Sequence, residues 1–202
     1  MNRRDFLQGV TFAAAATMTA AGPVFAAGDG QRHALPKPDV TQGRPLMACL
    51  AARRSNRALG REDLDWPTLG ALLWAAWGIN RDNGRHVIPT AMDRRQLAVF
   101  AVRGDGVWEY LPKEHAIKRV LDGDRRGRFD ASGLVLLYAA PGNDRFAPMH
   151  VGSMYQNVGL YCASVGLASC VKYQQHEALD AELPLPAGWM TYITQSVAHP
   201  AR

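Results

Sequence analysis

The chain has 202 residues and a formal net charge of +5, from 23 Lys and Arg against 18 Asp and Glu. Hydrophobic residues make up 48% and charged residues 20%, which is typical of a globular protein and excludes a disordered or fibrous chain. This length suffices for one domain whose core needs no disulfides. The weak positive charge suits a phosphate-bearing ligand, and it does not predict a nucleic-acid partner.

The first 26 residues predict an export signal. Residues 2–7 (NRRDFL) resemble the twin-arginine consensus of bacterial export signals, and an Ala/Thr-rich stretch follows from Val10 to Ala21. Residues 24–26 (VFA) then supply a cleavage site of A-x-A type. We therefore expect a twin-arginine signal peptide over residues 1–26, the twin-arginine translocase as partner during export, and a periplasmic mature protein. A short membrane anchor or an amphipathic helix is the alternative interpretation.

Residues 27–45 are rich in Gly, Pro and charge without periodicity, which predicts a mobile linker. Residues 46–54 then predict a short helix. Asp65 as N-cap and Pro67 in a first turn precede apolar residues at helical spacing, and predict a second helix that ends at Gly78. The charged segment 81–95 predicts a loop.

The second half of the chain predicts strands and helices in alternation. Strands are predicted over residues 97–102, 107–111, 133–140, 168–173 and 190–197, and helices over residues 114–121, 148–165 and 175–183. The first two strands form a hairpin around the turn at residues 104–106. The order favours an α+β domain over residues 46–202, with helices packed around one sheet.

Motifs of self-sufficient catalysis are absent from the sequence. It contains no GxxxxGK[ST], GxGxxG, GxSxG or HExxH segment. The six His lack metal-ligand spacing, and the three Cys, none in a CxxC pair, are predicted to be buried core thiols. We therefore predict no metal site, and an enzyme made from this chain requires a cofactor to carry the reaction.

The segment RRSNR at residues 53–57 is the most informative local feature, with three Arg and a Ser hydroxyl after a predicted helix. Guanidinium groups bind phosphate oxygens in a bidentate way, and Ser adds a neutral donor. The segment therefore predicts an anion-binding site. A solvated basic turn is the alternative.

Four segments in chain order resemble the nitroreductase-like flavoprotein family, above all its short branch related to the SagB-type dehydrogenases. They are RRSNRAL, DWPTLGALLWAAWGINRDNGRHVIPTAMDRR, MYQNVGLYCASVGLASCV and ITQSVAHP, within residues 46–200. The resemblance implies an α+β homodimer with a central, mostly antiparallel sheet surrounded by helices. It also implies FMN, bound in two sites at the subunit interface.

The resemblance implies cofactor contacts for the arginine segment. Arg53, Arg54 and Ser55 match the family's RRS and imply contacts to the phosphate and ribityl chain of FMN. Arg57 implies a cation at the pyrimidine edge of the ring, where reduction leaves negative charge. No residue is predicted to be catalytic, because FMN carries the chemistry and Arg57 tunes the ring.

A second set of contacts is implied for the segment Pro89, Thr90, Ala91 and Asp93. It matches the family's PSAxN loop, which approaches the flavin from the partner subunit. Asp93 stands where the family has Asn, so an amide donor is lost and a negative charge is gained.

Other positions follow from the same resemblance. Tyr173 and Gln174 stand where family members have Gly beside the flavin N5, and Arg202 is the candidate for a basic phosphate-binding residue of longer relatives. Gln156 and Asn157 match a QN pair that we interpret as mainly structural. Asp124 and Arg126 are further candidates for the ribityl chain.

The leading hypothesis is a periplasmic FMN oxidoreductase. It takes two electrons from a small-molecule donor and passes them, in ping-pong fashion, to a quinone, nitro compound or heterocycle. A SagB-type FMN dehydrogenase that oxidises an azoline or peptide substrate is the alternative. A non-catalytic flavin-binding relative is a third hypothesis, because of Asp93 and the missing loop Gly.

Overall fold

The computed structural model describes residues 30–173 and 177–201. The predicted signal peptide, Gln174 and Arg202 lie outside the described residues. The strands are β1 (Arg32–Ala34), β2 (Ala98–Arg103), β3 (Gly106–Leu111), β4 (Ala116–Asp122), β5 (Leu134–Pro141), β6 (Ala168–Lys172) and β7 (Trp189–Ala198). The helices are α1 (Leu46–Ala52), α2 (Trp66–Trp77), α3 (Ala147–Val165) and α4 (Glu177–Asp180), with 3-10 turns η1 (Ala91–Asp93) and η2 (Arg126–Arg128).

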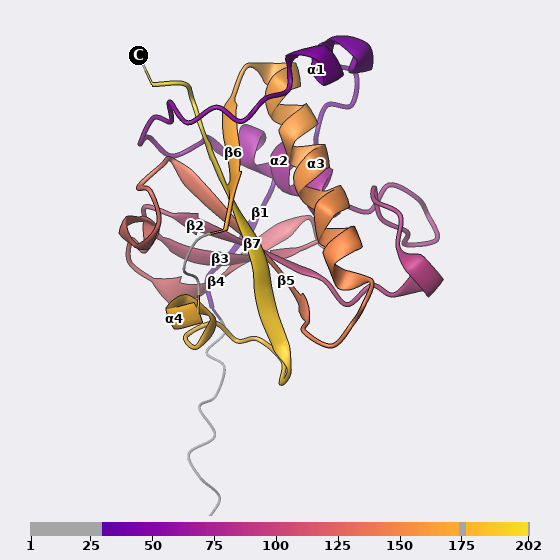
Figure 1. Cartoon of the computed structure of the whole chain (residues 1–202), viewed down its shortest axis with the longest axis vertical. Helices are drawn as coiled ribbons and strands as arrows, with labels where there is room; N and C mark the ends of the chain where they lie inside the picture. Colours follow the sequence, from indigo (N-terminus) through magenta and orange to yellow (C-terminus); the bar gives the residue numbers. More distant parts are fainter. Residues whose placement is uncertain (1–29, 174–176, 202) are drawn as a thin grey trace, which may run out of the picture.

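Within the described residues, the strands form one seven-stranded sheet in the order β1-β4-β3-β2-β5-β7-β6, and every neighbouring pair is antiparallel. The long helix α3 crosses in front of this sheet, and α1 lies at its C-terminal end (Figure 1). The predicted α+β architecture is therefore confirmed. No helix of the described ranges is long and apolar enough to cross a membrane.

Local signals set the limits of the two main helices. The Asp65 carboxylate accepts a 2.8 Å hydrogen bond from the Thr68 N–H, and Pro67 occupies the first turn of α2. Helix α3 ends at Gly166, whose φ of 78° lies in the left-handed region that favours glycine. Both boundaries agree with the prediction.

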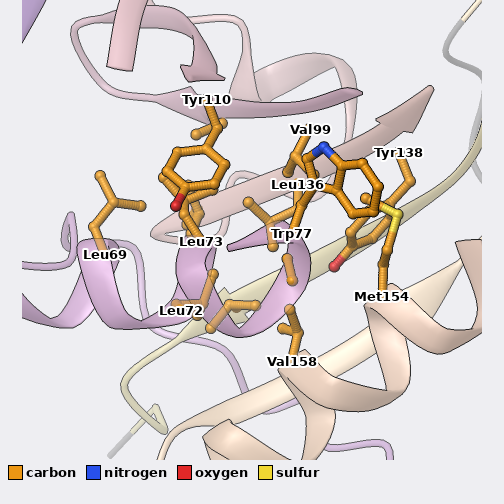
Figure 2. Close-up of a cluster of buried hydrophobic side chains, with 14 of the residues drawn as sticks. Leu69, Leu72, Leu73, Trp77, Val99, Tyr110, Leu136, Tyr138, Met154 and Val158 are labelled. Carbon is orange, nitrogen blue, oxygen red and sulfur yellow. The ribbon is translucent and has the colours of Figure 1, made fainter. Parts of the chain in front are cut away.

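The main core lies between these helices and one face of the sheet. Figure 2 shows Leu72, Leu73 and Trp77 of α2 and Met154 and Val158 of α3 pointing toward side chains of the strands. Alternate residues of β2 divide between two clusters, because successive side chains of a strand point to opposite faces. Because both faces of the sheet are buried, the sheet is a rigid support for the helices and loops that pack on it.

The helix predicted over residues 114–121 is wrong, because residues 116–122 form β4. The strand pairs with β3 from Leu111 opposite Ala116 to Gly106 opposite Asp122. The chain reverses at His115, which has a φ of 45°. The segment's charged residues fit a helix equally well, and pairing with β3 decides its conformation.

The linker predicted over residues 27–45 contains a strand. Residues 32–34 pair with β4 at the edge of the sheet, and Leu35 behind them is buried. The His115 Nε2–H donates to the Pro36 carbonyl at 2.8 Å. The segment covers the backbone groups that β4 would otherwise leave open, which Gly and Pro content does not reveal. Of the helix predicted over residues 175–183, α4 comprises only Glu177–Asp180.

Candidate functional site

A cleft of about 420 Å³ opens between the end of α1, the C-terminal half of α3 and the start of β6. We call it the arginine cleft, because Arg44, Arg53 and Arg54 all line it. The other lining residues are Ala51, Ala52, Asn56, Gly159, Cys162, Ala163, Gly166, Leu167, Ser169 and Pro200. Two of the predicted cofactor-binding residues, Arg53 and Arg54, are thus in one hollow.

Backbone contacts fix the arginine segment in place. The Arg53 N–H donates to the Cys49 carbonyl and closes α1, after which the chain becomes extended. The Asn56 N–H donates to the Ser169 carbonyl of β6 at 2.8 Å. The Arg53 stem lies over Gly159 of α3, where a Cβ would stand 3.5 Å from Arg53 Cδ. The segment is therefore attached to both α3 and the sheet.

Within the described residues, no carboxylate compensates the charge of the arginine cleft. No Asp or Glu is among its lining residues. The guanidinium groups of Arg44, Arg53 and Arg54 form no hydrogen bond or ion pair with any described residue. Three guanidiniums around a cleft without a carboxylate form a site for a multiply charged anion.

Sequence reasoning missed Arg44, because it lies in the predicted linker. Its N–H donates to Ser164 Oγ at 2.9 Å, which holds the segment against the end of α3. The only sequence signal was a basic residue between Gly43 and Pro45, and such residues are common in loops. Its place in the cleft depends on long-range packing.

A smaller recess of about 50 Å³ adjoins the arginine cleft and shares Arg53, Arg54, Gly159 and Ser169 with it. Ser55 lines this recess, together with Tyr155, Gln156, Val171 and Gln195. The buried Gln195 side chain accepts a 2.6 Å hydrogen bond from the Tyr138 hydroxyl, which fixes its orientation.

The predicted QN pair divides into two roles. Asn157 Nδ2 donates to the Ala75 carbonyl at 3.1 Å and ties α3 to α2, as a structural residue does. Gln156, which we also interpreted as structural, lines the smaller recess. Adjacent residues of a helix point about 100° apart, so one of the pair faces the site and the other the core.

The C-terminal segment lies beside the arginine segment. The Gly60 N–H donates to the His199 carbonyl, and the Ala201 N–H donates to the Ala58 carbonyl. Pro200 contributes to the wall of the arginine cleft. Arg57 is exposed and lines neither the cleft nor the smaller recess.

A separate recess of about 410 Å³ lies in the predicted loop, and we call it the loop recess. Its lining residues are Arg81, Arg85, His86, Val87, Ile88, Pro89, Thr90, Asp93 and Arg95. It shares no residue with the arginine cleft. In Figure 1 the magenta segment that carries η1 lies beside α3 and away from α1. A single chain therefore does not place Pro89, Thr90 and Asp93 beside the arginine cleft.

The loop is held in a defined conformation. The Ala91 N–H donates to His150 Nε2 of α3 at 2.8 Å. Met92 and Asp93 both have a φ near 55°, which costs free energy in residues with a Cβ. Arg95 binds both carboxylate oxygens of Asp93 at 2.8 and 2.9 Å, and these bonds hold the pKa of Asp93 below its ordinary value. The extra charge at position 93 is thus neutralised within the loop.

The remaining candidate residues in the described part of the chain are Tyr173, Asp124 and Arg126. Tyr173 follows β6 with 78% of its surface exposed. Arg126 donates to Asp63, Asp124 and the Arg61 and Gly133 carbonyls. Neither Arg126 nor Asp124 lines the arginine cleft or the smaller recess, and a contact with the ribityl chain stays a prediction. The bonds between Arg126 and Asp124 close the polar loop after β4.

The cysteines are buried, as predicted: Cys49, Cys162 and Cys170. Burial raises the pKa of Cys162 to about 12, which makes this thiol unreactive although it borders the arginine cleft. No group of three or more His, Cys, Asp or Glu with metal-binding geometry occurs in the described part of the chain.

Comparison with known proteins decides the family. The nitroreductase family model matches residues 50–193, which include the arginine segment, the loop recess and α3. The chain belongs to the nitroreductase family. A protein of Methanocaldococcus jannaschii described as a candidate nitroreductase is 28% identical over 158 residues, which cover 65% of this chain and 79% of the relative.

Solved structures of the nitroreductase family share the fold. A candidate nitroreductase of Ralstonia eutropha has a TM-score of 0.77 at 26% identity, over 87% of this chain and 92% of that chain. A nitroreductase of Bacteroides fragilis with bound FMN has a TM-score of 0.57 at 17% identity, over 78% of this chain and 89% of that one. At the latter identity the likeness concerns the fold alone.

Proposed function

We propose that this nitroreductase family member is an FMN-dependent oxidoreductase that passes two electrons to a small organic acceptor. The arginine cleft is the observation that carries the proposal. A phosphate monoester has a charge of about −1.5 to −2 near pH 7, which three uncompensated guanidiniums complement. FMN in the Bacteroides fragilis nitroreductase supports the choice of cofactor.

The residues that line the arginine cleft and the smaller recess fit successive parts of FMN. Arg44, Arg53 and Arg54 would hold the phosphate, and the Ser55 hydroxyl and Gln156 amide would bond to the ribityl chain. FMN, when bound, supplies two-electron chemistry at its ring. Arg57 is proposed to lie at the pyrimidine edge, where a cation stabilises the charge of the reduced state.

We propose further that the working unit is a homodimer in which the segment Pro89–Asp93 reaches the partner's arginine cleft. The separation of the two hollows within one chain supports this arrangement. So does the exposure of apolar side chains near the loop, since Met92 is 76% and Met149 is 61% exposed. Leu46 and Met47 of α1 are exposed as well.

The test is the flavin content and redox cycle of the purified protein. We expect one FMN per chain, reduction by a chemical donor without oxygen, and reoxidation by a quinone or nitro compound. Released FAD, or no flavin after reconstitution, would contradict the proposal. Bound FMN that oxidises a thiazoline peptide and ignores these acceptors would indicate the SagB-type reaction, and FMN inert toward all of them a non-catalytic relative.

Export by the twin-arginine route to the periplasm is also a proposal, and it rests on Arg3 and Arg4. A double Arg3→Lys, Arg4→Lys variant should accumulate as precursor in the cytoplasm of a bacterial host. Unchanged delivery of the mature protein to the periplasm would show that export does not depend on the two arginines.

A further inference from the structure

The loop recess has a chemistry of its own, which a flavin phosphate in the arginine cleft does not use. Three guanidiniums line it, from Arg81, Arg85 and Arg95, against one carboxylate, from Asp93. Its net charge is therefore two positive charges in a hollow of about 410 Å³. That volume is large enough for a small aromatic molecule.

Two of the three arginines are structural. Arg81 Nη2 donates to the His86 carbonyl at 2.9 Å, and Arg95 binds Asp93 and the Gly84 carbonyl. These bonds close the loop upon itself and fix the walls of the recess. The recess therefore exists before a ligand arrives, which lowers the entropy that binding costs.

The third arginine has no close partner among the described residues, although its charge contributes to the lowered pKa of Asp93. The Arg85 guanidinium forms no hydrogen bond or ion pair with residues 30–173 or 177–201, although its backbone is bound on both sides. An unpaired guanidinium in a fixed hollow forms strong, bidentate bonds with a carboxylate or phosphate.

His86 defines a second contact. Its ring stacks on Trp77 with centroids 3.5 Å apart, and its Nδ1–H donates to the Trp77 carbonyl at 2.9 Å. Burial lowers the pKa of His86, so the ring is neutral near pH 7 and Nε2 is an acceptor. His86 therefore adds a neutral aromatic wall to the recess, and Arg85 is the group that distinguishes an anionic ligand from a neutral one.

We propose that the loop recess binds the anionic end, a carboxylate or phosphate, of the small aromatic or heterocyclic electron acceptor, with Arg85 as its main ligand. This rests on the proposed function, because the recess adjoins a flavin only in the proposed dimer. The substrate class is thus organic anions. Neutral acceptors of the same shape react less well.

A single-turnover experiment tests this without the physiological donor. The FMN-loaded protein is reduced without oxygen by one equivalent of dithionite, and then mixed with 4-nitrobenzoate or with its neutral analogue 4-nitrobenzamide. In either case the nitro group takes two electrons from the reduced cofactor and two protons, becomes a nitroso group and releases water. The flavin absorbance reports reoxidation, and its dependence on concentration gives the apparent affinity for each acceptor.

We expect the preference for 4-nitrobenzoate over 4-nitrobenzamide to fall about tenfold or more in Arg85→Gln, because one charge-assisted contact is lost. The rate with 4-nitrobenzamide should fall less, because its neutral carbonyl forms a weaker hydrogen bond with a guanidinium than a carboxylate does. Arg85→Lys keeps the charge and should retain much of the preference. Lys113→Gln removes the same charge from the exposed turn between β3 and β4, and should leave the preference as in the wild type.

An equal preference in the wild type and in Arg85→Gln would overturn the proposal. A loss of FMN from Arg85→Gln, with the preference intact, would also overturn it and assign Arg85 to the cofactor. Failure of the wild type to retain FMN, or to reduce either compound, would instead refute the proposed function. Failure of the proposal for the loop recess is therefore distinguishable from failure of the proposed function.

Discussion

Arg44 is the residue whose role the fold changes most, since it joins Arg53 and Arg54 in the arginine cleft from a segment without any motif. We predict that Arg44→Ala weakens FMN binding about tenfold or more and leaves riboflavin binding unchanged. A hydrogen bond to a charged group contributes about 1.5–3 kcal/mol, and only FMN has the phosphate. Calorimetric titration of flavin-free protein measures both affinities.

The matched control is Arg32→Ala, which removes an exposed guanidinium that pairs with Glu114 at 3.1 Å, outside the cleft. Its affinities should equal those of the wild type. Equal losses of FMN and riboflavin affinity in Arg44→Ala would mean that the side chain supports the fold and does not contact the phosphate.

Arg57 should affect redox chemistry more than retention of the cofactor. It lies outside both recesses of the arginine site, and its proposed partner gains charge only on reduction. In Arg57→Ala the midpoint potential should fall by roughly 30–65 mV, from about 1.5–3 kcal/mol shared by two electrons. Potentiometry with reference dyes measures it. Loss of FMN at an unchanged potential would place Arg57 at the phosphate.

At the scale of elements, His150 of α3 couples the loop to pH. Its Nε2 accepts the Ala91 N–H, so the folded state needs the neutral ring, and burial lowers the pKa of His150. The unfolded chain titrates near the ordinary value of 6.5. Between the lowered pKa of the folded state and 6.5, the unfolded state binds more protons than the folded state. The free energy of unfolding therefore falls as the pH drops below 6.5.

The variant His150→Gln isolates this effect, because a Gln carbonyl accepts the same bond and does not titrate. Urea unfolding at about pH 7.5 and 5.5 should show a smaller loss of stability in the variant than in the wild type. Part of the loss of stability remains in the variant, because the pKa of His86 is also lowered. The same loss in both proteins would contradict the assigned role of His150.

Predictability differed between elements for physical reasons. Helices α2 and α3 carry their own stop and start signals in Asp65, Pro67 and Gly166, and so were predicted from local sequence. Strands β1 and β4 lack such signals. Their conformation depends on a neighbouring strand that offers free hydrogen-bonding groups, and the sequence does not reveal that neighbour.

At the scale of the whole molecule, the candidate site was predictable where its residues are adjacent in sequence. Arg53, Arg54 and Ser55 form one motif, and the structure places them around two connected hollows. Arg44, Gln156 and Gln195 come from distant segments and join the site only through packing. No local pattern marks them, because their contribution depends on tertiary contacts.

The proposed dimer predicts complementation between subunits. Arg53→Glu damages the arginine cleft, and Thr90→Glu damages the loop, so each variant alone should bind no FMN. Refolded together, mixed dimers contain one intact site, and binding should return to about a quarter of the wild-type capacity for random pairing. Sedimentation should report a dimer. No recovery on mixing would mean that each chain builds its site alone.

The central claim is that the arginine cleft holds the phosphate of FMN, and calorimetric titration of the flavin-free wild type with FMN and riboflavin tests it most directly. The two ligands differ only in the phosphate. Two or more charged contacts predict that FMN binds at least about a hundredfold tighter than riboflavin. Equal affinities, or binding of neither flavin, would contradict the claim.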